Sequence, residues 1–181
     1  TWIDIIAPTV RRAVLNGVDL DVATFTGTRL PLPGLSADNV LVVDADCAYM
    51  RTGEGLHRFV DPVDGGVYLY SKFEVADARR MYACFDQPDL KARFTFTVTA
   101  PADWQIISNG ATVSAEPAPG GGTRHSFATT EPMSTYVTAL VAGPYHVVRD
   151  HHDGIDLGLF CRSTLAEHLD AERLFTQTKQ G

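Results

Sequence analysis

The sequence contains few cysteines and no long apolar run. These absences argue against a disulfide-rich protein and against a membrane-spanning protein. Its three cysteines, Cys47, Cys84 and Cys161, are odd in number, and none belongs to a C-x-x-C pair. This pattern predicts neither a disulfide framework nor a thiolate zinc site, and it favours reduced thiols in the cytoplasm. No apolar run approaches the roughly 18 residues of a membrane-spanning helix, so we expect no membrane span.

Positive charge is also scarce, with 15 Lys and Arg residues against 22 Asp and Glu residues and a net charge of -7. The Arg11-Arg12 and Arg79-Arg80 pairs are isolated and form no basic stripe. Such a surface repels a phosphate backbone, so nucleic acid is not an expected partner. The hydrophobic share of 45% is typical of a globular domain, and 181 residues suffice for one core.

Helical periodicity is nearly absent before the C-terminal end, whereas short β-rich segments recur between turn residues. Phe94, Phe96 and Val98 alternate with threonines, as in a strand with one face on a core. Asn16 and Gly17 suit the tight turn of a hairpin. We therefore predict an all-β, antiparallel, saddle-like β-sandwich. The expected strands are 10–15, 18–20, 39–45, 67–70, 93–99, 105–108, 124–128, 135–141, 145–149 and 155–161.

Two further segments define the expected domain organisation. The Pro- and Gly-rich tract 116–122 cannot form a core; we expect it to cap a hairpin, with a domain linker as the alternative. Residues 163–180 are predicted to be helical, because Thr164 and Glu167 form a capping box. Residues 1–162 are thus assigned to a β domain, and 163–181 to the start of a helix leading out of it. Since the first residue is not methionine, we expect the true N-terminus to lie upstream.

Recognisable catalytic motifs are missing from the chain. It has no His-Glu-x-x-His zinc motif, no Gly-x-Ser-x-Gly elbow, no phosphate loop and no dinucleotide fingerprint. His151 and His152 are neighbours on an expected strand and point to opposite faces, so a polar turn is a simpler interpretation than a metal site. Cys84 has no histidine near it in sequence and is predicted to be a small buried hydrophobic residue. We expect neither a metal site nor a catalytic residue here.

Glu74 follows the expected strand 67–70 and precedes a turn that Asp77 is expected to cap. Its carboxylate is therefore placed near a strand end, where loops build sites. A carboxylate there can bind a free α-ammonium through a charge-assisted hydrogen bond. The alternative is a structural ion pair of Glu74 with Arg79 or Arg80, and the residues alone favour that alternative.

The segment 70–94, with several shorter segments, resembles the N-terminal domain of zinc-dependent aminopeptidases of the aminopeptidase N family. The similarity covers about residues 38–181 and rests on short motifs in a fixed order. These are Ser71-Lys72-Phe73-Glu74, Ala78-Arg79-Arg80, Ala83-Cys84-Phe85-Asp86-Gln87-Pro88 and Lys91-Ala92-Arg93-Phe94, supported by 51–57, Asp61-Pro62, Ser108-Asn109-Gly110 and Ala142-Gly143-Pro144-Tyr145.

The resemblance implies that the complete protein uses zinc to remove N-terminal amino acids from peptides. Glu74 would hold the free amino terminus of the peptide substrate. Lys72 stands where the family usually has Gln and would line the pocket for the first substrate side chain, where a cation either disfavours basic residues or pairs with Glu74. Gln87 replaces a usual Glu as a local structural variation. The zinc ligands and general base are expected in a catalytic domain beyond this chain, which would be inactive alone.

Two alternatives to this interpretation stay open. One is a non-catalytic β-sandwich module that binds peptides or glycans, which basic or aromatic residues converging on a groove away from Glu74 would favour. The other is an inactive member of the family that serves as a scaffold, which a downstream sequence without His-Glu-x-x-His would indicate.

Overall fold

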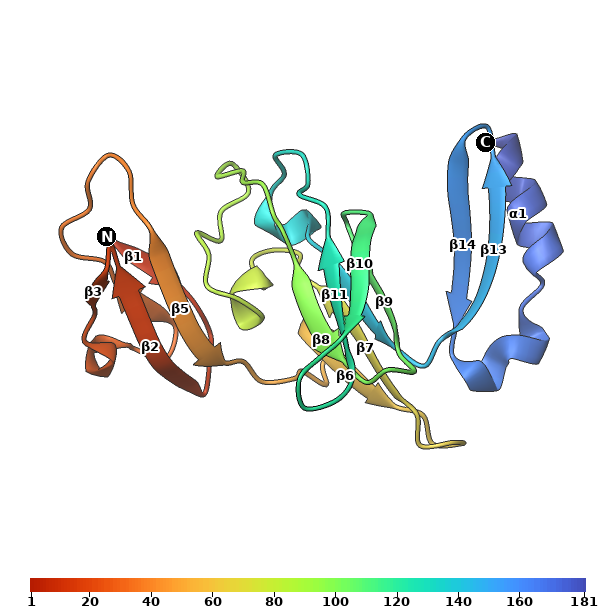
Figure 1. Cartoon of the computed structure of the whole chain (residues 1–181), viewed down its shortest axis with the longest axis horizontal. Helices are drawn as coiled ribbons and strands as arrows, with labels where there is room; N and C mark the ends of the chain where they lie inside the picture. Colours follow the sequence, from red (N-terminus) through yellow and green to blue (C-terminus); the bar gives the residue numbers. More distant parts are fainter.

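The computed structural model describes all 181 residues, and its elements form three groups along the long axis of the molecule (Figure 1). Strands β1–β5 lie at the N-terminal end, β6–β12 in the middle, and β13, β14 and α1 at the C-terminal end. The strands are β1 (Trp2–Asp4), β2 (Thr9–Leu15), β3 (Val18–Asp19), β4 (Arg29–Pro31), β5 (Leu41–Asp46), β6 (Gly55–Val60), β7 (Val67–Lys72), β8 (Thr97–Ala100), β9 (Gln105–Ser108), β10 (Thr112–Pro117), β11 (Thr123–Phe127), β12 (Leu140–Gly143), β13 (His146–His152) and β14 (Ile155–Cys161). The helices are the short 3₁₀ turns η1 (Val22–Thr24), η2 (Ala78–Arg80), η3 (Thr135–Val137) and η4 (Ser163–His168), and the α-helix α1 (Ala171–Gln180).

All the strand pairs are antiparallel, in the orders β1-β4, β3-β2-β5, β6-β7-β12-β9, β10-β11-β8 and β13-β14. This architecture confirms the all-β prediction with one C-terminal helix. None of the helices has the length and apolarity needed to span a bilayer.

The N-terminal group packs its two small sheets face to face around Ile3, Ala13, Leu30 and Leu32. Strand β2 contains a register shift between Val10 and Arg12. Such a bulge breaks the strict alternation of side chains, so two consecutive arginines both lie on the exposed side. Arg11 pairs with Asp44 and Asp46 on β5, and Arg12 pairs with Asp19 on β3.

The middle group is a sandwich of the four-stranded and three-stranded sheets. Leu69, Ile106, Leu140 and Ala142 of the first sheet pack against Phe127 of the second. Phe96 and Val98 join this core, as their alternation predicts, although the regular part of their strand begins only at Thr97. This core fixes β7, whose C-terminal end carries the predicted site residues.

Both predicted hairpins are present. Asn16 and Gly17 adopt positive φ angles of 52° and 82° between β2 and β3, as a tight hairpin turn requires. The tract 116–122 joins the antiparallel strands β10 and β11, and its turn is closed by a hydrogen bond from the Ala118 N–H to the Gly122 carbonyl. The tract is therefore a hairpin turn, and the linker alternative is wrong.

The predicted helix 163–180 is helical at both ends but is not one continuous helix. The structure divides it into η4 and α1, and α1 is capped by Asp170, which accepts from the Arg173 N–H at 3.2 Å. Thr164 does not act as a cap, because its hydroxyl donates to Asp61 at 2.7 Å. The α-helix covers the β13–β14 hairpin (Figure 1), and Phe175 is its buried residue.

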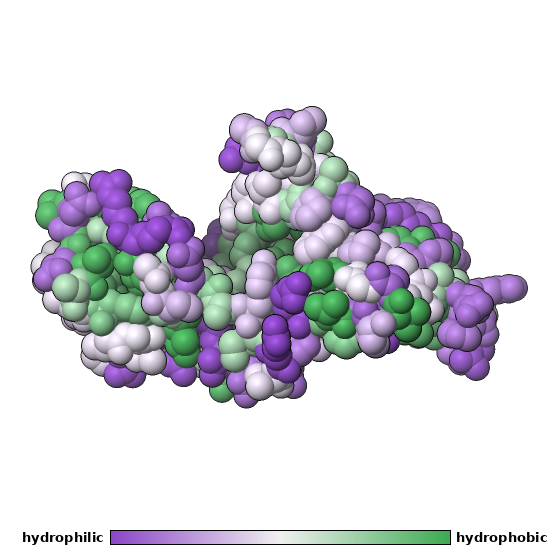
Figure 2. Space-filling model, turned by 90° about the horizontal axis from the view of Figure 1, so that it is seen from below, coloured by the Kyte–Doolittle hydropathy of each residue, from purple (hydrophilic) through white to green (hydrophobic).

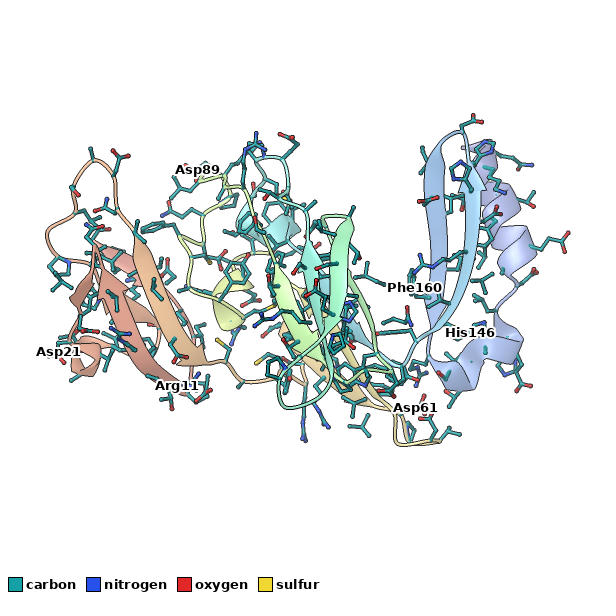
Figure 3. All side chains as sticks on the ribbon, in the orientation of Figure 1. Arg11, Asp21, Asp61, Asp89, His146 and Phe160 are labelled. Atoms are coloured by element: carbon teal, nitrogen blue, oxygen red, sulfur yellow. The ribbon has the colours of Figure 1, made fainter.

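Asp61 connects the C-terminal group to the middle sheet (Figure 3). Its side chain is 1% exposed and accepts hydrogen bonds from the Thr164 hydroxyl at 2.7 Å, the Val63 N–H at 2.9 Å and the Arg162 guanidinium at 2.9 Å. The Tyr68 hydroxyl accepts from the Ser163 N–H at 3.0 Å. The Thr164 and Val63 hydrogen bonds, together with Arg162, hold the pKa of Asp61 below its ordinary value of 3.8.

We expect Asp61→Asn to destabilise the chain in a pH-dependent way. A lowered folded-state pKa means that the unfolded state binds the proton first as pH falls. The stability contributed by the Asp61 carboxylate is therefore complete above about pH 4 and is lost as pH falls through the folded-state pKa. Urea unfolding should show a large difference between wild type and variant near neutral pH and a smaller one near pH 3.

The matched control is Asp64→Asn, in the same β6–β7 turn but at an exposed position, where Asp64 accepts from the Gly66 N–H. Its effect should stay within about 0.5 kcal/mol. A difference between Asp61→Asn and wild type that does not change with pH would contradict the assigned role of the Asp61 charge.

Candidate functional site

An open cavity of about 370 Å³ lies at the C-terminal end of β7. One side is formed by the strand end, residues 71–74, and the other by residues 136–139 of η3 and the segment that follows it. Both site residues predicted from the sequence, Lys72 and Glu74, line this cavity. The structure thus brings them together with a segment more than 60 residues away along the chain.

Phe73 fixes the end of β7 because its side chain is 2% exposed and packs with Ala78 and Cys84. Its ring lies edge-on to that of Tyr82, with centroids 6.2 Å apart. Successive side chains of an extended segment point in opposite directions. With Phe73 directed into the core, Lys72 and Glu74 are left exposed at the cavity, and the Val75–Ala76 peptide bond that follows is cis.

Glu74 does not form the structural ion pair that the sequence favoured. Arg79 contacts Asp4 at 3.9 Å, and Arg80 binds Asp77 at 2.6 Å. Because Asp77 is paired with Arg80, its side chain does not cap η2, contrary to the prediction.

The partner of Glu74 is Lys72, with 3.9 Å between Nζ and Oε2, and the two side chains are 60% and 64% exposed. Exposed pairs of this kind contribute about 0–1 kcal/mol. The Glu74 carboxylate is therefore only weakly engaged and is open to another cation.

The opposite wall of the cavity is held by side chains that bind the backbone. Asn109 donates to the Val137 carbonyl at 3.0 Å and accepts from the Ala139 N–H at 2.6 Å. Ser71 accepts from the Leu140 N–H at 2.8 Å. Since these side chains satisfy backbone groups that a sheet partner would otherwise bind, the predicted strand 135–141 becomes η3 followed by β12.

Tyr82 links the motif-rich segment to this wall. The Thr138 hydroxyl donates to the Thr135 carbonyl at 2.7 Å, so it accepts from the Tyr82 hydroxyl, also at 2.7 Å. Burial raises the pKa of Tyr82, and the hydroxyl stays protonated as this arrangement requires.

Asp86 provides the second link between the two walls. Its buried carboxylate accepts from the Thr135 hydroxyl at 2.6 Å and from the Arg79 N–H at 3.2 Å. Beside it, the Ser134 hydroxyl donates to the Pro88 carbonyl. The turn that contains Asp86 is thus bound to η2 on one side and to η3 on the other.

Other chemistry-bearing residues lie apart from this cavity. Cys84 is buried, which raises the pKa of its thiol and keeps it neutral, as expected of a structural cysteine. His151 contacts Asp156 across the β13–β14 hairpin at 3.0 Å, and His152 contacts Asp153 at the turn. No group of three or more His, Cys, Asp or Glu side chains in the chain is placed to hold a metal ion.

A second cavity, of about 360 Å³, is lined entirely by apolar residues that include Ile3, Val43 and Met81. It lies where the N-terminal group meets the segment after η2, and a hollow between these parts is visible in Figure 2. Ligand sites need a few placed polar groups to orient what they bind. The Lys72–Glu74 cavity has such groups, and it holds both residues that the sequence predicts for the site, so we take it as the candidate site.

The residues of the η3 wall, above all Asn109 and 136–139, were not found by sequence reasoning. The alternation in 135–141 resembles a strand, and Asn109 was noted only as part of the Ser108-Asn109-Gly110 segment of the family resemblance. The closely spaced Ser134, Thr135 and Thr138 could have indicated an interrupted strand, because short polar side chains compete for backbone groups.

The chain is similar to known aminopeptidases over all or part of its length. Residues 51–137 match the peptidase M1 N-terminal domain. Over all of its length the chain is 52% identical to aminopeptidase N of Streptomyces lividans, of which it covers 21%. It is 43% identical over 55% of its length to aminopeptidase N of Acetobacter pasteurianus, of which it covers 28%, and 33% identical over 63% to human glutamyl aminopeptidase, of which it covers 12%.

These matches define the chain as an N-terminal domain of the M1 aminopeptidase family, and they confirm the resemblance found in its motifs. The whole chain aligns with aminopeptidase N of Streptomyces lividans. It spans about a fifth of the length of the Streptomyces relative.

We expect Asp86→Ala to destabilise the chain by roughly 2–5 kcal/mol, because it leaves the Thr135 hydroxyl and the Arg79 N–H buried without an acceptor. Urea unfolding measures this loss. Gln87→Ala, at the neighbouring exposed position, is the matched control and should change stability by less than about 0.5 kcal/mol. Equal effects of the two substitutions would contradict the role given to the Asp86 carboxylate.

Proposed function

We propose that the chain is the N-terminal β domain of a zinc-dependent aminopeptidase that removes N-terminal amino acids from peptides. In this proposal Glu74 holds the free α-ammonium of the substrate, and Lys72 lines the pocket for the first side chain. The observation that carries it is the position of Glu74, whose carboxylate lines an open cavity and has only a 3.9 Å contact with Lys72. The aminopeptidase names of the relatives support the reaction class.

A carboxylate at this position explains why only the end of a peptide would be cleaved. An α-ammonium offers Glu74 a charge-assisted hydrogen bond. An internal amide nitrogen has no charge to offset the carboxylate once substrate and catalytic domain exclude water from it. The exposed Lys72–Glu74 contact contributes little, so an incoming ammonium can replace it.

The zinc of the proposed enzyme would be bound outside this chain, since the residues here offer no set of three metal ligands. Zinc bound there would polarise the scissile carbonyl and activate a water molecule. The role of this chain is to bind the amine end and shape the pocket. We also propose that residues 163–181 lead into the catalytic domain and that the protein is cytoplasmic, in keeping with its three free cysteines.

The test is hydrolysis of a panel of aminoacyl chromogenic amides by the full-length protein with zinc. Glu74→Ala should lower kcat/KM by roughly 30- to 900-fold, which corresponds to roughly 2–4 kcal/mol, because it removes one partner of a charge pair formed in the transition state. The 181-residue chain alone should be inactive.

Glu54→Ala is the matched control, because Glu54 is an exposed glutamate that contacts Arg80 and does not line the cavity. Its kcat/KM should remain close to that of the wild type. Full activity of the Glu74→Ala variant would contradict the assigned role of Glu74. A full-length protein without activity on any amide would instead favour the scaffold or the binding module.

A further inference from the structure

The two charged side chains of the cavity stand next to each other and have opposite signs. Among the eight lining residues, Lys72 is the one cation and Glu74 the one anion. The other six are apolar or carry only a hydroxyl group. A ligand that presents a positive and a negative group close together therefore finds a partner for each of them.

Binding of a substrate ammonium to Glu74 removes the ion-pair partner of Lys72. Its one ion-pair contact is with Glu74, at 3.9 Å. Once Glu74 turns to the substrate, the Lys72 ammonium is left without a carboxylate partner. It cannot move far from the cavity, because its backbone is held in β7 by pairing opposite Gly55 of β6.

An acidic first residue supplies the missing partner. In aspartate and glutamate the α-nitrogen and the side-chain carboxylate are separated by roughly 3–5 Å, as bond lengths dictate. This span matches the 3.9 Å between the charged atoms of Lys72 and Glu74. We propose, on the basis of the proposed function, that Lys72 and Glu74 together select peptides whose first residue is aspartate or glutamate.

The charge of Lys72 also ranks peptides with other first residues. A lysine or arginine at the first position brings a second cation toward Lys72 and is repelled. A small neutral residue such as alanine meets neither attraction nor repulsion from Lys72. The selection is therefore measured by the ratio of kcat/KM for acidic and basic first residues. The kcat/KM for alanine measures catalysis without any contribution from the charge of Lys72.

The experiment compares glutamyl, alanyl and lysyl chromogenic amides with the full-length protein and zinc. Lys72→Gln, which removes the charge and keeps a polar side chain one atom shorter, should lower the glutamyl-to-lysyl ratio of kcat/KM by about 10- to 100-fold, the range expected for a hydrogen bond to a charged group. Lys72→Arg should keep most of the ratio. Higher ionic strength should lower the wild-type ratio, since salt screens this attraction.

Lys91→Gln is the matched control, because Lys91 is an exposed lysine outside this cavity. It should leave the ratio unchanged. An unchanged ratio in a Lys72→Gln protein that still cleaves the alanyl amide overturns the selection by Lys72 and leaves the proposed function standing. An equal fall for all three amides also overturns it, since the charge of the first residue would then be irrelevant. A wild type that cleaves none of them overturns the proposed function itself.

Discussion

The buried carboxylate of Asp86 is the interaction on which the candidate site depends. It binds the Arg79 N–H in the segment that follows Glu74 and the Thr135 hydroxyl at the start of the opposite wall. These two contacts hold together segments that are far apart in the chain. Tyr82 adds a parallel link to Thr138. The opening of the cavity is therefore set by buried polar contacts beneath it, while the charged side chains at its mouth remain free to meet a substrate.

The cavity exists because a regular sheet stops short of it. Strand β12 pairs with β7 at Leu69 and Tyr70 and goes no further toward the strand end. Beyond that point the Ser71 hydroxyl satisfies the Leu140 N–H, and Asn109 satisfies the backbone on either side of Thr138. A continued ladder would have closed the gap between the two strands. Short polar side chains thus replace backbone pairing at the place where a substrate end must enter.

The sequence predicted well what depends on neighbouring residues. The two hairpins and the core face of Phe96 and Val98 follow from local turn chemistry and alternation, and Glu74 lies near a strand end as predicted. The errors have distant causes. Thr164 matched a helix cap but donates to Asp61, about 100 residues earlier in the chain. The segment 135–141 matched a strand but is shaped by Asn109, whose contacts with it span about 30 residues of the chain.

A structure of the full-length protein with a free amino acid product bound would test the central claim most directly. The account predicts the α-ammonium of the product within about 2.7–3.2 Å of a Glu74 carboxylate oxygen, the ordinary range for such a hydrogen bond. The product side chain should lie beside Lys72 and the η3 wall. A product bound with its ammonium elsewhere, and Glu74 still directed to solvent or to Lys72, would contradict the account.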